Sequence, residues 1–197
     1  MEYPNNFTVA EKKIVISTIE FIEKYGLEAA TIRRIADYAG VNSAAIGYYF
    51  RSKDKLIQIA MEQTLDNAFD MDDFSESEGK PVRERLIHVF TLLAEGAIQY
   101  PRLTRAHLHD TFIKGSYTSD ACKRINEFFL KLEKEIIDSG YQMDITEMRM
   151  KLIQLGASVV FYMGVMPDLL TPFSELKLSD PETREKYIRI LVESLFH

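Results

Sequence analysis

The sequence has a single cysteine and no long apolar run, and each absence excludes a class of protein. Cys122 alone cannot form a disulfide within the chain, which fits a reducing compartment. The longest uncharged run, residues 152–167, is shorter than the roughly 18 apolar residues of a membrane-spanning helix. Residues 1–7 lack the basic and apolar regions of a secretion signal. We therefore expect a soluble cytoplasmic protein with no membrane partner.

Motifs that would hold a cofactor or a metal ion are also missing. The chain has no glycine-rich phosphate loop, no paired cysteines and no His-Glu-x-x-His spacing. His107 and His109 are close in sequence, but residues two apart on a helix point about 200° apart, so a regular helix cannot chelate one metal ion with both. We expect no cofactor, no metal and no catalytic residue. The alternative of an intracellular metal site or hydrolase depends on this histidine pair.

The alternation of apolar and polar residues that is typical of strands is absent, whereas helical periodicity recurs along the chain. Thr8 and Glu11 have the spacing of a capping box, and Asp144 and Asp180 are similar helix starts. The acidic segment 72–81 predicts a loop. We expect an all-α protein of about nine helices. Residues 1–52 would form a three-helix helix-turn-helix head, and residues 53–197 a helical bundle.

The segment 31–55 predicts two short helices joined by a tight turn and followed by a third. Thr31 can cap the first helix, Gly40 can end it in the left-handed conformation, and Asn42 or Ser43 can cap the second. Three positions have a steric meaning, because the helices would cross at a small residue, turn at a glycine and pack through a branched side chain. These residues are Ala36, Gly40 and Ile46. This is the geometry of a helix-turn-helix or, alternatively, of an ordinary αα-corner in a helical core.

Four motifs occur in order here: TIRRIA at 31–36, AGVN at 39–42, IGYYF at 46–50 and SKDKL at 52–56. Over roughly residues 8–60 they resemble the DNA-binding signature of the TetR family of bacterial transcriptional regulators. Gly47 departs from the family, which commonly has tyrosine there. The resemblance implies a homodimer that binds a palindromic double-stranded DNA operator and is a repressor released by a small-molecule effector. The alternative is a helical ligand-binding or interaction protein that does not bind DNA specifically.

The distribution of charge agrees with a local DNA-binding face. The whole chain carries a net charge of −6, which argues against a generally basic nucleic-acid binder. Within residues 31–55, however, five Lys or Arg stand against two Asp or Glu. A basic face on an acidic body can bind phosphates while the rest of the molecule repels DNA.

Two kinds of DNA contact are expected from this segment. Hydroxyls and cations at helix N-termini suit phosphates, and we assign them to Thr31, Arg33 and Lys53. The first residues of the second helix would face the bases; these are Ser43, Ala44 and Ala45. By resemblance to the family, Tyr48, Tyr49 and Lys53 also face the DNA, although Tyr49 could equally pack inside the head.

The C-terminal bundle offers candidates for effector binding and for dimerisation. Aromatic and imidazole side chains could line an effector pocket, or simply fill the core; they are Phe90, Tyr100, His107, Phe112, Phe128, Phe161 and Tyr162. Small or apolar residues on the least polar helix and on the last helix are the candidate dimer interface: Gly156, Val160, Gly164, Ile188, Leu191 and Leu195. By resemblance, these two helices would form a four-helix bundle with those of the partner.

Overall fold

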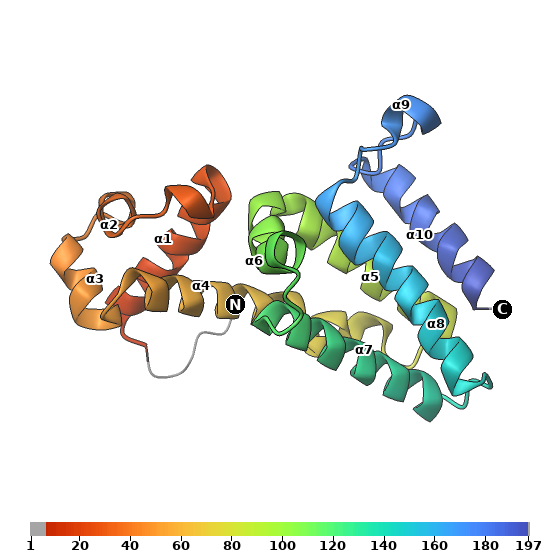
Figure 1. Cartoon of the computed structure of the whole chain (residues 1–197). Coiled ribbons are helices and arrows are strands. Elements are labelled where there is room, and N and C mark those ends of the chain that lie inside the picture. Colours follow the sequence, from red (N-terminus) through yellow and green to blue (C-terminus); the bar gives the residue numbers. More distant parts are fainter. Residues whose placement is uncertain (1–6, 197) are drawn as a thin grey trace. The chain divides into compact units, whose positions relative to one another are not determined.

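The computed structural model describes residues 7–196, without the side chains of Asp72, Asp73 and Asp110, and the chain is helical over most of this range (Figure 1). The elements in order are α1 (Val9–Tyr25), the 3₁₀ helix η1 (Leu27–Ala29), α2 (Ile32–Ala39), α3 (Ser43–Phe50), α4 (Lys53–Ala68), the 3₁₀ helix η2 (Met71–Ser77), α5 (Val82–Gln99), α6 (Pro101–Lys114), α7 (Asp120–Asp138), α8 (Ile145–Gly156), the π-helix η3 (Ala157–Met163), α9 (Thr171–Ser174) and α10 (Pro181–Leu195). No strand occurs in the described residues, so the predicted all-α class is confirmed.

The sequence predicted neither a membrane-spanning helix nor a secretion signal, and the structure bears only on the first prediction. No helix within residues 7–196 combines the length and the apolar character needed to span a bilayer. The expectation that a secretion signal is absent rests on residues 1–7, and residues 1–6 lie outside the described range.

The predicted caps start the helices. In the capping box of α1, Glu11 N–H donates to Thr8 Oγ1 at 3.2 Å and Thr8 N–H donates to Glu11 Oε2 at 2.8 Å. The backbone hydrogen bond from Thr8 lowers the pKa of Glu11. Asp144 accepts hydrogen bonds from the first turn of α8, and Asp180 does the same for α10. Each side chain satisfies amides that the helix itself leaves unpaired.

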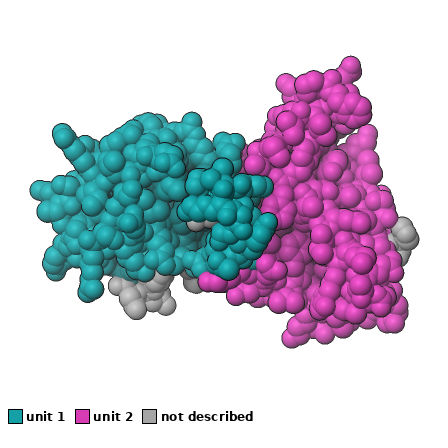
Figure 2. Space-filling model, in the orientation of Figure 1, with its two compact units in different colours: residues 1–69, 102–122 teal, residues 70–101, 123–197 magenta. Residues whose placement is uncertain are grey.

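The chain forms two compact units (Figure 2). Unit 1 contains residues 1–69 and 102–122, and unit 2 contains residues 70–101 and 123–197. This grouping differs from the predicted boundary between residues 52 and 53. The reason is that α4 packs against α1, so the whole of α4 belongs to unit 1, and that most of α6 joins the same unit.

The core of unit 1 lies where α1 covers the other head helices. Buried apolar side chains from α1 to α4 fill it: Ile14, Val15, Phe21, Ala30, Ile35, Ala36, Ile46, Phe50, Leu56 and Ala60. Beside this core, the Arg34 guanidinium lies over the rings of Phe21 and Tyr25, at 5.2 and 5.6 Å from their centroids. These contacts fasten α2 to the C-terminal end of α1.

Helix α6 is fastened to the head at two points. The Glu23 carboxylate on α1 accepts hydrogen bonds from Arg102 N–H at 3.1 Å and Leu103 N–H at 3.0 Å. It therefore caps the N-terminus of α6 from another helix, where a negative charge is favourable. Further along α6, His107 Nε2 lies 2.8 Å from the hydroxyl of Thr64 on α4. That hydroxyl already donates to a backbone carbonyl, so the imidazole must carry its proton on Nε2 and donate.

The core of unit 2 contains a buried arginine that joins three elements. Arg85 on α5 donates to both carboxylate oxygens of Glu135 on α7, at 3.0 and 3.2 Å. It also donates to Ser77 Oγ at 2.9 Å and to the carbonyl of Phe74, both on η2. The predicted loop at 72–81 is therefore wrong for its first part. Phe74 and Ser77 are buried among acidic neighbours. Ser77 Oγ donates to Phe74 C=O at 3.1 Å, and Arg85, distant in sequence, donates to both groups.

A π-helix interrupts the least polar segment of the chain. Gly164 N–H bonds to Val159 C=O, five residues earlier, as the π geometry requires. Just before this segment, a Cβ added to Gly156 would lie 2.5 Å from the ring of Phe129, so a larger residue would force that ring to move. Gly156, Val160 and Gly164 were expected to share one face at a period of four. The π-helix changes that period, and Gly156 faces a side chain of its own unit.

We predict that His107 makes the stability of unit 1 depend on pH. Burial penalises the imidazolium and lowers the pKa of His107 from 6.5 to about 4. Because the folded-state pKa lies below that of the unfolded chain, the contribution is fully present above pH 6.5 and is lost as the pH falls toward 4. At 1.36 kcal/mol per pKa unit, the loss reaches roughly 3 kcal/mol. Urea unfolding between pH 7 and 4.5 should show a smaller loss for His107→Gln than for the unsubstituted chain.

The matched control is His109→Gln, which removes an imidazole two residues away. We expect its pH dependence to follow that of the unsubstituted chain. Equal losses for His107→Gln and the unsubstituted chain would contradict the assignment.

Candidate DNA-binding surface

The turn between α2 and α3 is built as predicted. Gly40 has φ 64° and ψ 41°, the left-handed conformation that glycine adopts without strain. Val41 N–H bonds to Ala36 C=O at 3.0 Å and Gly40 N–H to Asp37 C=O at 3.3 Å, the pair of bonds in a Schellman motif. Ala36 and Ile46 are buried at the crossing of the two helices. The helix-turn-helix geometry is confirmed.

Three side chains cap the helices that surround this turn. Thr31 Oγ1 accepts from Arg34 N–H at 3.3 Å, and Ser52 Oγ accepts from Lys55 N–H at 3.1 Å. Of the two predicted caps for α3, the structure uses Asn42, whose Oδ1 accepts from Ala44 N–H at 2.8 Å. Ser43 is therefore the first residue of α3 and keeps its hydroxyl for an outside partner.

Helix α3 presents one face to solvent. Ser43, Ala44, Gly47 and Tyr48 are exposed, and Tyr48 is 82% exposed. We call these four residues the α3 face. A Cβ added to Gly47 would meet nothing within 4 Å, so the face has room there.

Two of the predicted DNA contacts lie away from the α3 face. Ala45 is half-buried, and Tyr49 is half-buried and packs against the core of unit 1. Tyr49 packs against the cluster that contains Ile46 and Phe50. The packing alternative for Tyr49 is the one that the structure shows.

The predicted phosphate contacts lie at helix N-termini. Thr31 is the cap of α2 and Arg33 lies in its first turn, and both are exposed. Lys53 is the first residue of α4 and is half-buried. Their hydroxyl, guanidinium and ammonium groups and the free amides around them are the donors that bind phosphate in other proteins.

The turn between α3 and α4 contains a strained residue that sequence reasoning missed. Arg51 has φ 65° and ψ −39°, and Ser52 N–H bonds to Phe50 C=O at 2.8 Å. This is close to the geometry of a γ-turn with positive φ, which is rare and costly for a residue with a Cβ. Nothing in the local sequence marks it, because arginine has no preference for such a turn.

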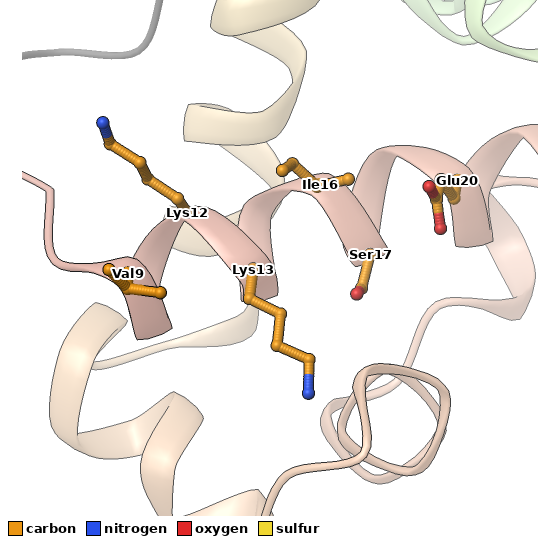
Figure 3. A pocket seen from close by; sticks show the side chains of 6 residues that line it. All are labelled: Val9, Lys12, Lys13, Ile16, Ser17 and Glu20. Carbon is orange, nitrogen blue, oxygen red and sulfur yellow. The ribbon is translucent and has the colours of Figure 1, made fainter.

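A shallow groove of about 370 Å³ runs along the outer side of α1, and the sequence did not predict it (Figure 3). It is lined by Val9, Lys12, Lys13, Ile16, Ser17 and Glu20. Figure 3 shows the side chains of Lys12 and Lys13 leaving α1 in different directions, so they do not converge on one ligand. The Lys13 ammonium lies beside Gly40, 3.8 Å from where a Cβ would be. There it complements the negative C-terminal end of α2.

Comparison with known proteins bears on this surface directly. The family model described as "Bacterial regulatory proteins, tetR family" matches residues 14–59. Residues 14–59 therefore match the TetR family. The match ends before most of α4 and all of unit 2, so it covers the TetR helix-turn-helix and the helices that support it.

Curated relatives match over the same TetR segment. The HTH-type transcriptional regulator BetI 1 of Chromohalobacter salexigens is 42% identical over 57 residues, which cover 29% of this chain and 28% of that protein. BetI of Escherichia coli is 35% identical over 54 residues, covering 27% and 28%. The match therefore spans less than a third of the length of these relatives.

Solved structures extend the likeness in fold to the rest of the chain. The fatty acid degradation regulator FadR from Bacillus halodurans has a TM-score of 0.67 at 16% identity and covers 95% of this chain and 96% of that one. A TetR transcription regulator from Haloarcula marismortui has a TM-score of 0.65 at 20% identity, with coverages of 96% and 97%. The all-α fold of both units is thus shared with TetR regulators.

The seven candidate effector residues are divided between the two units. Phe90 and Phe128 are buried in a cluster of aromatic rings in unit 2, 6.5 Å apart at their centroids. Phe161 and Tyr162 are half-buried in η3, and Tyr100 is exposed. The other two, His107 and Phe112, belong to unit 1. The first two serve as core, which is the alternative that the sequence left open.

The candidate dimer residues are less exposed than expected. Ile188 is fully buried within unit 2, and Gly156 is buried against Phe129, so neither offers surface to a partner. Gly164 is also buried, and Val160, Leu191 and Leu195 are half-buried. The large apolar side chains that are more than half exposed on these helices are instead Met150 and Ile153 on α8 and Ile190 on α10.

We predict that Arg51→Gly is more stable than Arg51→Ala by about 1 kcal/mol, since alanine keeps the Cβ that strains the turn. Both variants lose the guanidinium group, so their difference in the free energy of unfolding isolates the backbone term. Urea unfolding of the pair measures it. A Gly variant no more stable than the Ala variant would show that the turn relaxes at no cost.

Proposed function

We propose that this chain is a ligand-responsive transcriptional regulator, a repressor that binds a palindromic operator as a homodimer in the cytoplasm and leaves it when a small molecule binds. The observation that supports this most is the α3 face. It is exposed, flanked by capped helix N-termini, and lies in the segment that matches the TetR family. The BetI proteins, which share this segment, are named as transcriptional regulators.

The α3 face would enter the major groove, with its first residues at the base edges. Ser43 can exchange a hydrogen bond with a base, and Ala44 can contact only the methyl group of thymine. Gly47 leaves space, and Tyr48 reaches outward from the same side. Thr31, Arg33 and Lys53 would bind phosphates and fix the register of the helix without reading sequence. Direct readout is then modest, and groove shape contributes to specificity.

Two heads must match two half-sites, so the functional form is a two-fold symmetric dimer. We place its interface on the exposed sides of α8 and α10, which carry Met150, Ile153 and Ile190. Apolar side chains of this size gathered on one unit favour contact with a partner. Sedimentation of the purified protein should return twice the chain mass of 22.7 kDa.

A ligand can act on DNA binding only through a difference in its affinity for two states. In unit 1, α6 is joined to the head by the Glu23 cap and by the hydrogen bond between Thr64 and His107. A molecule that favours one position of α6 would therefore favour one position of the head. No catalytic step is part of this proposal.

A mobility-shift assay on genomic DNA fragments tests the function itself. A discrete set of retained fragments that share a palindrome supports the regulator. Retention of none, or of all fragments equally, would favour the second candidate, a helical ligand-binding protein without specific DNA recognition.

On a retained fragment, Lys53→Ala should weaken binding to all sequences alike, because a phosphate contact carries no sequence information. The slope of log K against log salt should fall in magnitude by about 1. The matched control is Lys80→Ala in unit 2, which removes the same charge and should change neither quantity. An altered sequence preference in Lys53→Ala would place this lysine at the bases instead.

A further inference from the structure

The segment between η3 and α10 exposes apolar side chains, whereas an ordinary surface loop exposes mainly polar ones. Five large apolar side chains in residues 166–176 are exposed: Met166, Leu169, Leu170, Phe173 and Leu176. Phe173 is the most exposed of them, at 85%. We call residues 166–176 the apolar arm. It contains α9 and extends from one end of unit 2 (Figure 1).

Three of the polar side chains of the apolar arm bond to the protein itself. Thr171 Oγ1 donates to Leu176 C=O at 2.8 Å, and Ser174 Oγ donates to Leu170 C=O at 2.9 Å. Asp168 accepts from Ser179 N–H at 3.2 Å and from Ser179 Oγ at 2.7 Å. These bonds use hydroxyls and a carboxylate that a solvated loop would give to water. Asp168 and Glu175 are exposed as well, but most of the large exposed side chains of the arm are leucine, methionine and phenylalanine.

The base of the apolar arm is held in place by α10. The guanidinium of Arg184, which is buried, donates to Ser179 C=O at 3.0 Å and lies 3.6 Å from the carboxylate of Glu95 on α5. Leu178 is buried beside it. The arm is therefore fixed before it meets any partner, which reduces the entropy lost on binding.

We infer that the apolar arm packs against a second copy of this chain and extends the dimer interface. This inference rests on the proposed function, which requires a homodimer. The arm follows α8 and η3 directly and precedes α10, so it is continuous along the chain with the two helices whose exposed sides carry Met150, Ile153 and Ile190.

The surface area that a stable dimer buries also supports a second copy of this chain as the partner of the apolar arm. A stable interface buries about 800 Å² on each partner. At roughly 100 Å² for each large apolar side chain, Met150, Ile153 and Ile190 supply roughly 300 Å², which is too little. The five side chains of the arm bring the total to about 800 Å². A membrane is a poorer partner, because residues 61–197 contain 16 Lys or Arg against 23 Asp or Glu, and anionic lipid repels such a body.

The test is a double variant, Leu169→Asp with Phe173→Asp, measured as the dimer dissociation constant by sedimentation over a dilution series. We expect that constant to rise at least about tenfold, since each substitution occurs twice across the two-fold axis. The matched control is Ile113→Asp with Tyr117→Asp, two exposed residues of unit 1, which should leave the constant unchanged. Circular dichroism checks that both variants keep their helices.

A second measurement locates the arm itself. With the photo-cross-linking amino acid p-benzoylphenylalanine in place of Phe173, irradiation should join two chains. A dimer whose dissociation constant is unchanged in the arm variant, and which gives no cross-link between chains, would overturn the inference and leave the proposed function intact. A chain that stays monomeric at every concentration would overturn both. Co-sedimentation with phosphatidylcholine vesicles, lost in the arm variant, would assign the arm to lipid and overturn the inference.

Discussion

The close approach of α3 to α2 is the constraint on which the DNA-binding surface depends. Ala36 and Ile46 are buried where the two helices cross, and Gly40 closes α2 in a conformation that a larger residue would adopt only with strain. This crossing decides which side of α3 is buried, because Ile46 and Phe50 must face the core. The exposed side is then fixed as Ser43, Ala44, Gly47 and Tyr48. The surface that we propose for DNA recognition thus follows from packing inside the head.

The parts of the fold that short-range rules determine could be predicted from the sequence. Thr8, Asp144 and Asp180 cap helices as expected, and the helix-turn-helix has its turn at Gly40. These features depend on residues within about four positions of each other, where hydrogen bonding and backbone sterics decide. The division of the chain into units was not predictable in this way, because it depends on which helices pack together.

The features that the sequence did not reveal depend on distant partners or on strain. Arg85 is close to Phe74 and Ser77 only because the chain folds back, and Glu23 caps a helix that begins 78 positions later in the sequence. The γ-turn at Arg51 has no local signature. Ala45 was assigned to the DNA because the first residues of a recognition helix are usual contacts, and Tyr49 by resemblance to the family. Their half-burial depends on how α3 packs in the head, because residues adjacent to Ile46 and Phe50 on the helix point about 100° away from them.

From the chemistry of the α3 face we propose that this helix reads DNA with small side chains and without bidentate hydrogen bonds. Binding to operator half-sites in which each thymine in turn is replaced by uracil tests it most directly, because the replacement removes only a methyl group. We predict a loss of affinity at one or more thymines in the major groove facing Ala44. Unchanged affinity at every thymine would contradict this placement of α3 in the groove.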